Sequence, residues 1–162
     1  MSEVTLEPWE REWAQHVGVK RHEANLSKRD AHYYDQSRME DNVRASVAAA
    51  CAELATAKLL NKYWDGSYWT ASQHGKFADR ADVGSNTEVR RVRNRGNPLP
   101  VRARDVERGR VMVLAFPVPD EFTTVEVIGY GMAAELWEFG RPADYDQAGT
   151  TRLVPQGWLR PL

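Results

Sequence analysis

The sequence predicts a single α+β domain in which N-terminal helices pack on a mostly antiparallel or mixed central sheet. Two patterns support this class. Apolar residues recur at helical spacing up to about residue 63, whereas the later apolar segments are short and alternate with polar residues as strands do. The length of 162 residues and the hydrophobic share of 42% suit one domain with a full hydrophobic core.

The first part of the chain is predicted to be helical. Trp9 and Trp13 stand four residues apart, and Pro8 occupies a position that suits the first turn of a helix. Residues 22–38 are polar and poorly periodic, so we interpret them as a connection or a partly exposed helix. Residues 1–40 are therefore described as a helical N-terminal extension.

A second helix is predicted to begin the core of the domain, which we place at residues 41–162. From 40 to 63 the chain is rich in alanine and leucine and contains no glycine or proline, which is typical of a strong helix. Extension and core together form the single domain 1–162.

The remaining elements are predicted in chain order. A short strand, a turn at Gly84–Asn86 and an alternating run at Thr87–Arg93 form a hairpin. The later segments are an alternating strand at 99–103, an apolar central strand at 110–118, a strand at 123–130, a short helix at 131–140 and a docked extended tail at 150–162.

Charge is unevenly distributed along the chain. The net charge of −1 argues against a strongly basic nucleic-acid binder. Between Lys76 and Arg110, however, the sequence contains ten basic residues and five acidic ones. From Val111 onward it contains three basic residues and seven acidic ones. Such asymmetry directs a polyanion to one face, although a solvated arginine-rich surface is an equally simple interpretation.

Membrane and secreted classes are disfavoured by the sequence. No apolar run approaches the roughly 18 residues that a transmembrane helix requires. The acidic, polar beginning does not have the pattern of a secretory signal. A single cysteine, Cys51, excludes an internal disulfide framework. We expect a cytoplasmic protein without a membrane partner.

The hairpin, "ADVGSNTEVRR", carries two carboxylates that the turn brings together. Residues two apart in a strand share a face, so Glu88 and Arg90 point the same way, and Asp82 lies across the turn from Glu88. Adjacent carboxylates repel each other, which raises the pKa of one of them. A divalent cation relieves that repulsion, and sites with one or two carboxylates commonly hold Mg²⁺. An ordinary polar hairpin is the simpler alternative.

The predicted long helix carries a third acidic residue of interest. Glu53 is a lone carboxylate on a helix face of small residues that suits close packing on a sheet. Burial of such a charge without a partner costs several kcal/mol. A metal, a water or an arginine is therefore implied if this face is buried, whereas a Glu53 at the helix edge would be solvated.

Four separated blocks of the sequence, taken in their order along the chain, carry a resemblance to a known group of proteins. These blocks are "CAELATAKLLNKYW", "ADVGSNTEVRR", "LPVRARD" and "LVPQGWLRPL". Together they resemble the PD-(D/E)XK nuclease superfamily, and more narrowly a group of small phage and prophage proteins of that type, over roughly residues 40–162. The resemblance implies a restriction-endonuclease-like core, metal-dependent hydrolysis of phosphodiester bonds, and action in the host cytoplasm if the protein is phage-encoded.

The resemblance also implies roles for individual residues. Asp82 and Glu88 would bind Mg²⁺ or Mn²⁺, with the carbonyl of Val89 as a third ligand and Glu53 completing the site directly or through water. Arg90 stands where the superfamily usually has a catalytic lysine. Because arginine stays protonated, Arg90 can bind phosphate or orient water but cannot act as the general base.

Two functional hypotheses remain open from the sequence. In the first, a nuclease acts on nucleic acid, with DNA preferred, and a homodimer would supply two sites for cutting a duplex. In the second, a catalytically inactive nuclease-like fold binds DNA or a host protein, and its carboxylates form a structural ion network with Glu53 or Glu88 paired to Arg90. In either case the predicted phosphate contacts are Arg91, Arg93, Arg95, Arg102 and Arg104.

Overall fold

A computed structural model describes residues 1–27, 42–77 and 79–162, without the side chains of Ala71 and His74. The predicted α+β class is confirmed, because two N-terminal helices pack on a mixed sheet. The segment 22–38, interpreted as a connection or a partly exposed helix, falls mainly on residues 28–41 and so lies largely outside the described ranges.

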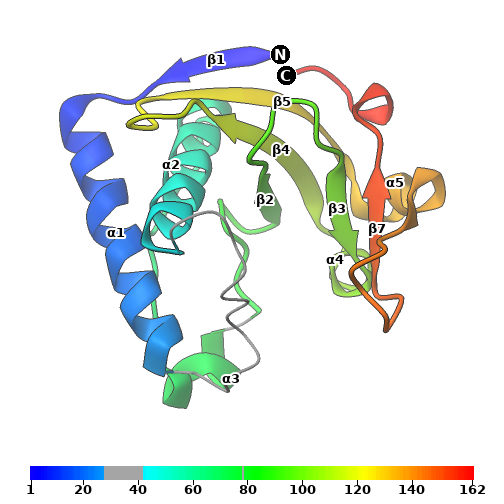
Figure 1. Cartoon of the computed structure of the whole chain (residues 1–162), viewed down its shortest axis with the longest axis horizontal. Helices are drawn as coiled ribbons and strands as arrows, with labels where there is room; N and C mark the ends of the chain where they lie inside the picture. The colour runs from blue at the N-terminus through cyan, green and yellow to red at the C-terminus, as the bar shows by residue number, and fades with distance from the viewer. Residues whose placement is uncertain (28–41, 78) are drawn as a thin grey trace.

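The central sheet has four strands in the order β1-β5-β4-β2 (Figure 1). The strands β1 and β5, and likewise β5 and β4, pair antiparallel, whereas β4 and β2 pair parallel. This arrangement leaves β2 at one edge of the sheet. The strands are β1 Ser2–Thr5, β2 Thr87–Arg91, β4 Val111–Pro117 and β5 Thr124–Met132.

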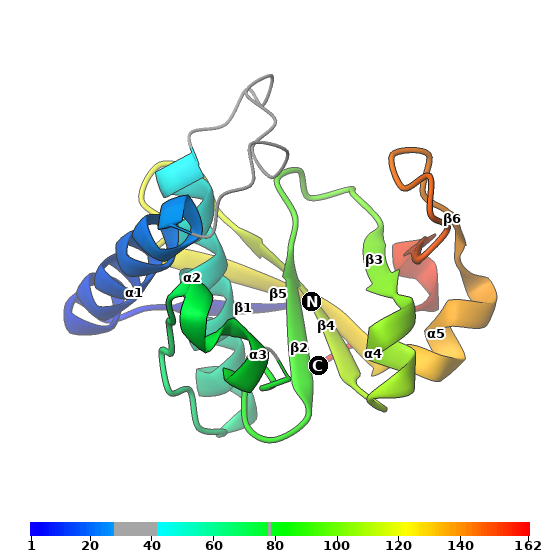
Figure 2. The same ribbon diagram turned by 90° about the horizontal axis from the view of Figure 1, so that it is seen from below.

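The long helix α2 packs on one face of this sheet and α1 packs against α2, whereas a smaller unit covers the other face (Figure 2). The long helices are α1 Pro8–Ser27 and α2 Asn42–Leu60. The smaller unit is a three-stranded sheet in the order β3-β7-β6 with two short helices. Its elements are β3 Leu99–Arg102, α4 Ala103–Glu107, α5 Ala133–Phe139, β6 Arg141–Pro142 and β7 Thr151–Val154.

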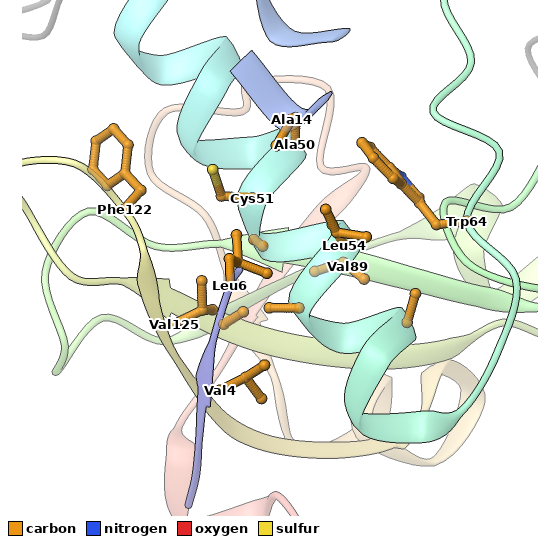
Figure 3. Packing of buried hydrophobic residues seen from close by; sticks show 14 of the residues in the cluster. Val4, Leu6, Ala14, Ala50, Cys51, Leu54, Trp64, Val89, Phe122 and Val125 are labelled. Carbon is orange, nitrogen blue, oxygen red and sulfur yellow. The ribbon is translucent and has the colours of Figure 1, made fainter. Parts of the chain in front are cut away.

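Strand alternation divides the hydrophobic core between the two faces of the central sheet. Val89, Val113 and Val125 point toward α2 and pack with side chains such as Leu54 (Figure 3). Met112, Leu114 and Phe116 on β4 point the opposite way and pack against the smaller unit. The side chain of Val89 therefore faces α2, and those of its neighbours Glu88 and Arg90 face the smaller unit.

The helices α1 and α2 cross closely at one glycine. A Cβ added to Gly18 would lie 2.5 Å from the Cα atom and 2.7 Å from the amide nitrogen of Val47. Only a residue without a side chain permits this approach, because the obstructing atoms are backbone. The crossing brings α1 close enough to α2 for side chains of both helices to meet near the edge of the sheet.

The structure corrects the sequence-based predictions at three places. Ser2–Thr5 forms a strand that pairs with β5, so the segment 1–40 contributes to the central sheet and is not only helical. The short strand predicted before the turn at Gly84–Asn86 does not form: the described residues of 67–83 contain a 3₁₀ turn and the short helix α3 His74–Phe77, and among them only Val83 forms a bridge. The short helix α4 follows the strand at 99–102 directly and was not predicted.

Candidate functional site

Of the predicted hairpin, only the turn forms, closed by a single bridge at the outer edge of β2. Val83 and Thr87 exchange backbone hydrogen bonds of 3.0 and 3.2 Å, which directs the polar backbone groups of Thr87 away from β4. Two residues further along, the N–H of Val89 donates to Oδ2 of Asp82 at 2.8 Å. The N–H and C=O of one strand residue point to the same side, so the carbonyl of Val89 also lies on this outer edge.

Glu88 is buried between two arginines on the adjoining face of β2. Its Oε2 lies 3.2 Å from Nη1 of Arg90, and its Oε1 lies 3.3 Å from Nε of Arg110. The same Nη1 of Arg90 is 4.0 Å from Oδ2 of Asp82. Asp82, Glu88 and Arg90 are thus brought together as the sequence predicted, while Arg110 is a partner that sequence reasoning missed.

The two carboxylates of this pair perturb each other. Burial raises the pKa of Asp82 to about 6, with the charge of Glu53 as a further cause. Burial and the charge of Asp82 raise the pKa of Glu88 to about 7. Strongly raised carboxyl pKa values of this kind are typical of functional sites, where like charges are held together for a purpose other than stability.

These raised pKa values predict a loss of stability as the pH rises. The folded protein holds more protons than the unfolded chain between the ordinary carboxyl pKa and about pH 7, so the free energy of unfolding falls across that interval. Between pH 5 and pH 8, in EDTA, urea titrations should show an excess loss of about 4 kcal/mol. The excess is taken relative to the Asp82→Asn, Glu88→Gln double variant.

Glu107 supplies the matched control for this measurement, because it is an exposed carboxylate on the nearby helix α4. Glu107→Gln should retain the wild-type dependence on pH. Equal slopes for the wild type and the double variant would show that Asp82 and Glu88 titrate as ordinary carboxylates.

Arg90 also donates hydrogen bonds to a second carboxylate, Asp105, to which the sequence patterns gave no role. Asp105, on α4, accepts from Nη2 of Arg90 through both oxygens, at 3.0 and 2.9 Å, and is 1% exposed. Its Oδ2 also accepts the backbone N–H of Arg102 at 2.8 Å. The only sequence signal for Asp105 is its place at the end of the block "LPVRARD".

Arg110 is fixed by backbone acceptors from the turn before β2. Its guanidinium donates to the carbonyl of Ser85 at 3.4 Å and to the carbonyl of Asp79. With an exposure of 6%, Arg110 is buried, and it is the second cation facing Glu88. The hairpin turn and the start of β4 are therefore tied together through one side chain.

Glu53 lies at the same edge but on the helical side of the sheet. It is 7% exposed, so the interpretation of Glu53 as a solvated side chain is wrong. Nη1 of Arg21 donates to both of its oxygens at 2.8 Å, and the indole N–H of Trp64 donates to Oε2 at 2.9 Å. The partner that a buried Glu53 requires is therefore an arginine from α1, and Asp82 stands between Glu53 and Glu88.

Two pockets flank Asp82. One, of about 170 Å³, is lined by Arg21, Glu53, Tyr68, Trp69, Arg80 and Asp82, among others. The other, of about 250 Å³, shares Arg80, Ala81 and Asp82 with the first. Arg80 is itself paired with Asp65 at 2.6 Å. Asp82 is thus accessible from two hollows, whereas Glu88 is covered.

The oxygen donors at this edge fit a small hard cation. Asp82, Glu88 and the carbonyl of Val89 offer oxygen only, the ligand type that Mg²⁺ and Mn²⁺ take. Within the described ranges, no group of three or more His, Cys, Asp or Glu side chains is arranged to hold a metal ion. The set is therefore limited to two carboxylates and a backbone carbonyl, and Arg90 and Arg110 balance the charge of Glu88.

The five arginines that were predicted to contact phosphate have different surroundings in the structure. Arg95 is committed to an ion pair with Glu126, at 2.5 and 2.8 Å. Arg91 and Arg93 line a separate pocket beyond the end of β2. Partial removal from water, together with the charges of Arg90 and Arg104, lowers the pKa of Arg102.

Comparison of the chain with protein-family models, with curated proteins and with solved structures gave no match. In the described part of the chain, no helix is long and apolar enough to cross a membrane.

Proposed function

We propose that this protein is a metal-dependent nuclease-like protein that hydrolyses phosphodiester bonds in nucleic acid, with DNA as the preferred polymer. The observation that carries the proposal is that Asp82 and Glu88 both lie close to Nη1 of a positioned Arg90, where β2 borders the hairpin turn. Two mutually perturbed carboxylates next to a fixed cation are suited to a reaction in which negative charge develops on phosphate oxygens.

Each residue has a distinct part in this proposal. Asp82, Glu88 and the Val89 carbonyl would hold Mg²⁺ or Mn²⁺, which supplies an acidified water and Lewis-acid polarisation when bound. Arg90 contacts the phosphate and stabilises the charge that builds up there. Asp105 acts through Arg90 as a positioning residue, because its two hydrogen bonds fix the direction of the guanidinium.

Arg90 itself does not remove the proton from the attacking water. The charges of Asp105 and Glu88 outweigh the effect of burial and raise its pKa above the ordinary arginine value. A guanidinium in such surroundings stays protonated at every working pH. Its contribution is therefore electrostatic, and the proton passes to solvent or to a phosphate oxygen.

A second function is favoured by a different observation. Both oxygens of Glu88 are engaged by arginines, and both oxygens of Glu53 accept from Arg21. Carboxylates balanced in this way form the structural ion network expected of an inactive nuclease-like fold that binds DNA or a host protein. The two functions differ in whether the carboxylates exchange arginine for a divalent cation.

We expect purified protein to nick plasmid DNA or degrade single-stranded DNA in Mg²⁺ or Mn²⁺ and to be inactive in EDTA. Glu88→Gln should lower the rate at least about 100-fold, because one of the two carboxylate ligands is lost. Glu107→Gln, on the exposed side of α4, is the matched control and should keep wild-type activity. Thermal melts of both variants check that they are folded.

Calorimetric titration with Mn²⁺ separates the two functions further. Under the nuclease proposal, the wild type binds Mn²⁺ and the Asp82→Asn and Glu88→Gln variants bind it at least about tenfold more weakly. Absent metal binding contradicts the metal site. Salt-dependent DNA binding without hydrolysis in either metal would favour the binding module.

A further inference from the structure

Glu88 is only one of the carboxylates that hold Arg90 in place. A single hydrogen bond of 3.2 Å joins Nη1 of Arg90 to Oε2 of Glu88. Nη2 of the same guanidinium donates two shorter hydrogen bonds to Asp105, at 3.0 and 2.9 Å. Arg90 therefore keeps a buried carboxylate partner when the side chain of Glu88 turns away from it.

Arg110, the second cation facing Glu88, is likewise anchored without it. Its guanidinium donates to the carbonyl of Ser85 at 3.4 Å and to the carbonyl of Asp79. Both acceptors are backbone atoms of the chain just before β2, so their positions do not depend on the side chain of Glu88. Glu88 can thus leave Arg110 while the guanidinium keeps its acceptors.

The contact between Arg110 and Glu88 is a contact of charges and not a hydrogen bond. Nε of Arg110 lies 3.3 Å from Oε1 of Glu88, yet this buried nitrogen has no hydrogen-bond partner among the described residues. Both side chains are buried, so little water screens the attraction between them. Such a contact holds the carboxylate by charge, without the directional preference of a hydrogen bond.

Glu88 is also a carboxylate that the proposed metal site requires. A divalent cation held by Asp82 and Glu88 supplies the positive charge that Arg110 otherwise supplies to Glu88. Two cations at one buried carboxylate repel each other, because the interior screens their charges poorly. The contact of Glu88 with Arg110 and its binding to a metal therefore oppose each other.

Arg110 differs from Arg90 in its access to a substrate. Its side chain is buried more deeply than that of Arg90. Its other printed contacts are the two backbone carbonyls, which hold it against the turn before β2. The charge of Arg110 therefore acts on the carboxylate of Glu88, whereas Arg90 is the cation placed to contact phosphate.

We propose that Arg110 is a positioning residue that competes with the divalent cation for Glu88 and so limits the metal affinity of the site. The inference rests on the proposed function in taking Asp82 and Glu88 as metal ligands. Without metal, Arg110 compensates the buried charge of Glu88. With metal, Glu88 turns from Arg110, and both arginines keep their other acceptors. The charge that stabilises the site without metal therefore also weakens its affinity for metal.

Calorimetric titration of the full chain with Mn²⁺ tests this competition. Arg110→Met removes the charge and keeps an unbranched side chain, so it should bind Mn²⁺ at least about tenfold more tightly than the wild type. Arg110→Gln also lacks the charge but retains an amide donor for a backbone carbonyl, and it should show the same gain. Structural damage at the site would instead lower the affinity for Mn²⁺.

Two further variants separate the charge of Arg110 from other effects. Arg110→Lys keeps a positive charge at this position and should not show the gain. Arg108→Met removes a cation two residues earlier that is paired with Asp79, and it should change the affinity for Mn²⁺ by less than about threefold. At one fixed Mn²⁺ concentration, the rise in melting temperature should be larger for Arg110→Met than for the wild type.

The melting curves without metal also decide the case in which removal of the charge prevents folding. If Arg110→Met and Arg110→Gln fold only when Mn²⁺ is added, the cation substitutes for Arg110 at Glu88 and the inference is sustained. If both stay unfolded in Mn²⁺, Arg110 is a purely structural residue and the inference is overturned.

The inference and the proposed function can fail separately. Wild-type or weaker Mn²⁺ affinity in Arg110→Met and Arg110→Gln, or an equal gain in Arg110→Lys, would overturn the inference and leave the nuclease proposal standing. Suppose instead that Mn²⁺ binds only after the charge is removed and is lost again in the Arg110→Met, Glu88→Gln double variant. That result sustains the inference and refutes the nuclease proposal for the wild type. If no variant binds Mn²⁺, both are wrong.

Discussion

Replacement of Asp105 by alanine lowers the free energy of unfolding by about 3 to 5 kcal/mol, because it leaves Arg90 buried with its principal partner removed. Asp105 is 1% exposed and accepts three hydrogen bonds, two from Arg90 and one from the backbone of Arg102. The Asp105 side chain is buried and that of Arg90 is only 17% exposed, so solvent has little access to the donors that the variant leaves behind. The loss therefore includes the cost of a buried guanidinium that keeps only Glu88 and Asp82 as carboxylate partners.

Urea titration at neutral pH measures this loss. Asp105→Asn keeps the volume of the side chain and removes its charge, so it should fall between the wild type and Asp105→Ala. Glu107→Ala, two residues further along α4 and exposed, should change stability by less than about 0.5 kcal/mol. A loss below about 1 kcal/mol in Asp105→Ala would mean that Arg90 finds another acceptor.

The Gly18→Ala variant is expected to lose about 3 kcal/mol, at the upper end of the penalty for overpacking. The added Cβ would stand 2.5 Å from the Cα atom of Val47, so α1 and α2 must move apart along their length. Alanine is the better helix former by up to about 1 kcal/mol, and the expected loss is what remains after that gain.

Gly75 is the matched control for this substitution. It lies in the short helix α3, and a Cβ at this position would meet nothing within 4 Å. Gly75→Ala should therefore be neutral or stabilising by up to about 1 kcal/mol. If Gly18→Ala and Gly75→Ala have the same free energy of unfolding as the wild type, the close approach of α1 to α2 is wrong.

The sequence predicted those elements whose own residues carry a strong pattern. The helix expected within 40–63 is α2, and the apolar run at 110–118 contains the central strand β4. Strand alternation also placed Glu88 and Arg90 on one face, and the tight turn placed Asp82 beside them. In each case the information is local, so no knowledge of the tertiary fold is needed.

Contacts between distant elements were not predictable in the same way. Asp105 follows Arg90 by 15 residues and lies in a helix of five residues, too short to show a helical period. The partner of Glu53 is Arg21, which reaches it only because α1 packs on α2 at Gly18. The sequence required a partner for Glu53 but could not identify it, because the choice depends on how the helices cross.

The position of Asp82 at the rim of the central sheet has a consequence for the association of one molecule with another. β2 is an edge strand, and the backbone groups of Thr87 and Val89 face outward, where another strand could pair with them. Val83 occupies the first of these positions, and the carboxylate of Asp82 occupies the second. The carboxylate of Asp82 accepts the hydrogen bond of the Val89 N–H, so a strand of a second molecule cannot pair with that group. The same carboxylate therefore disfavours aggregation through this edge of the sheet.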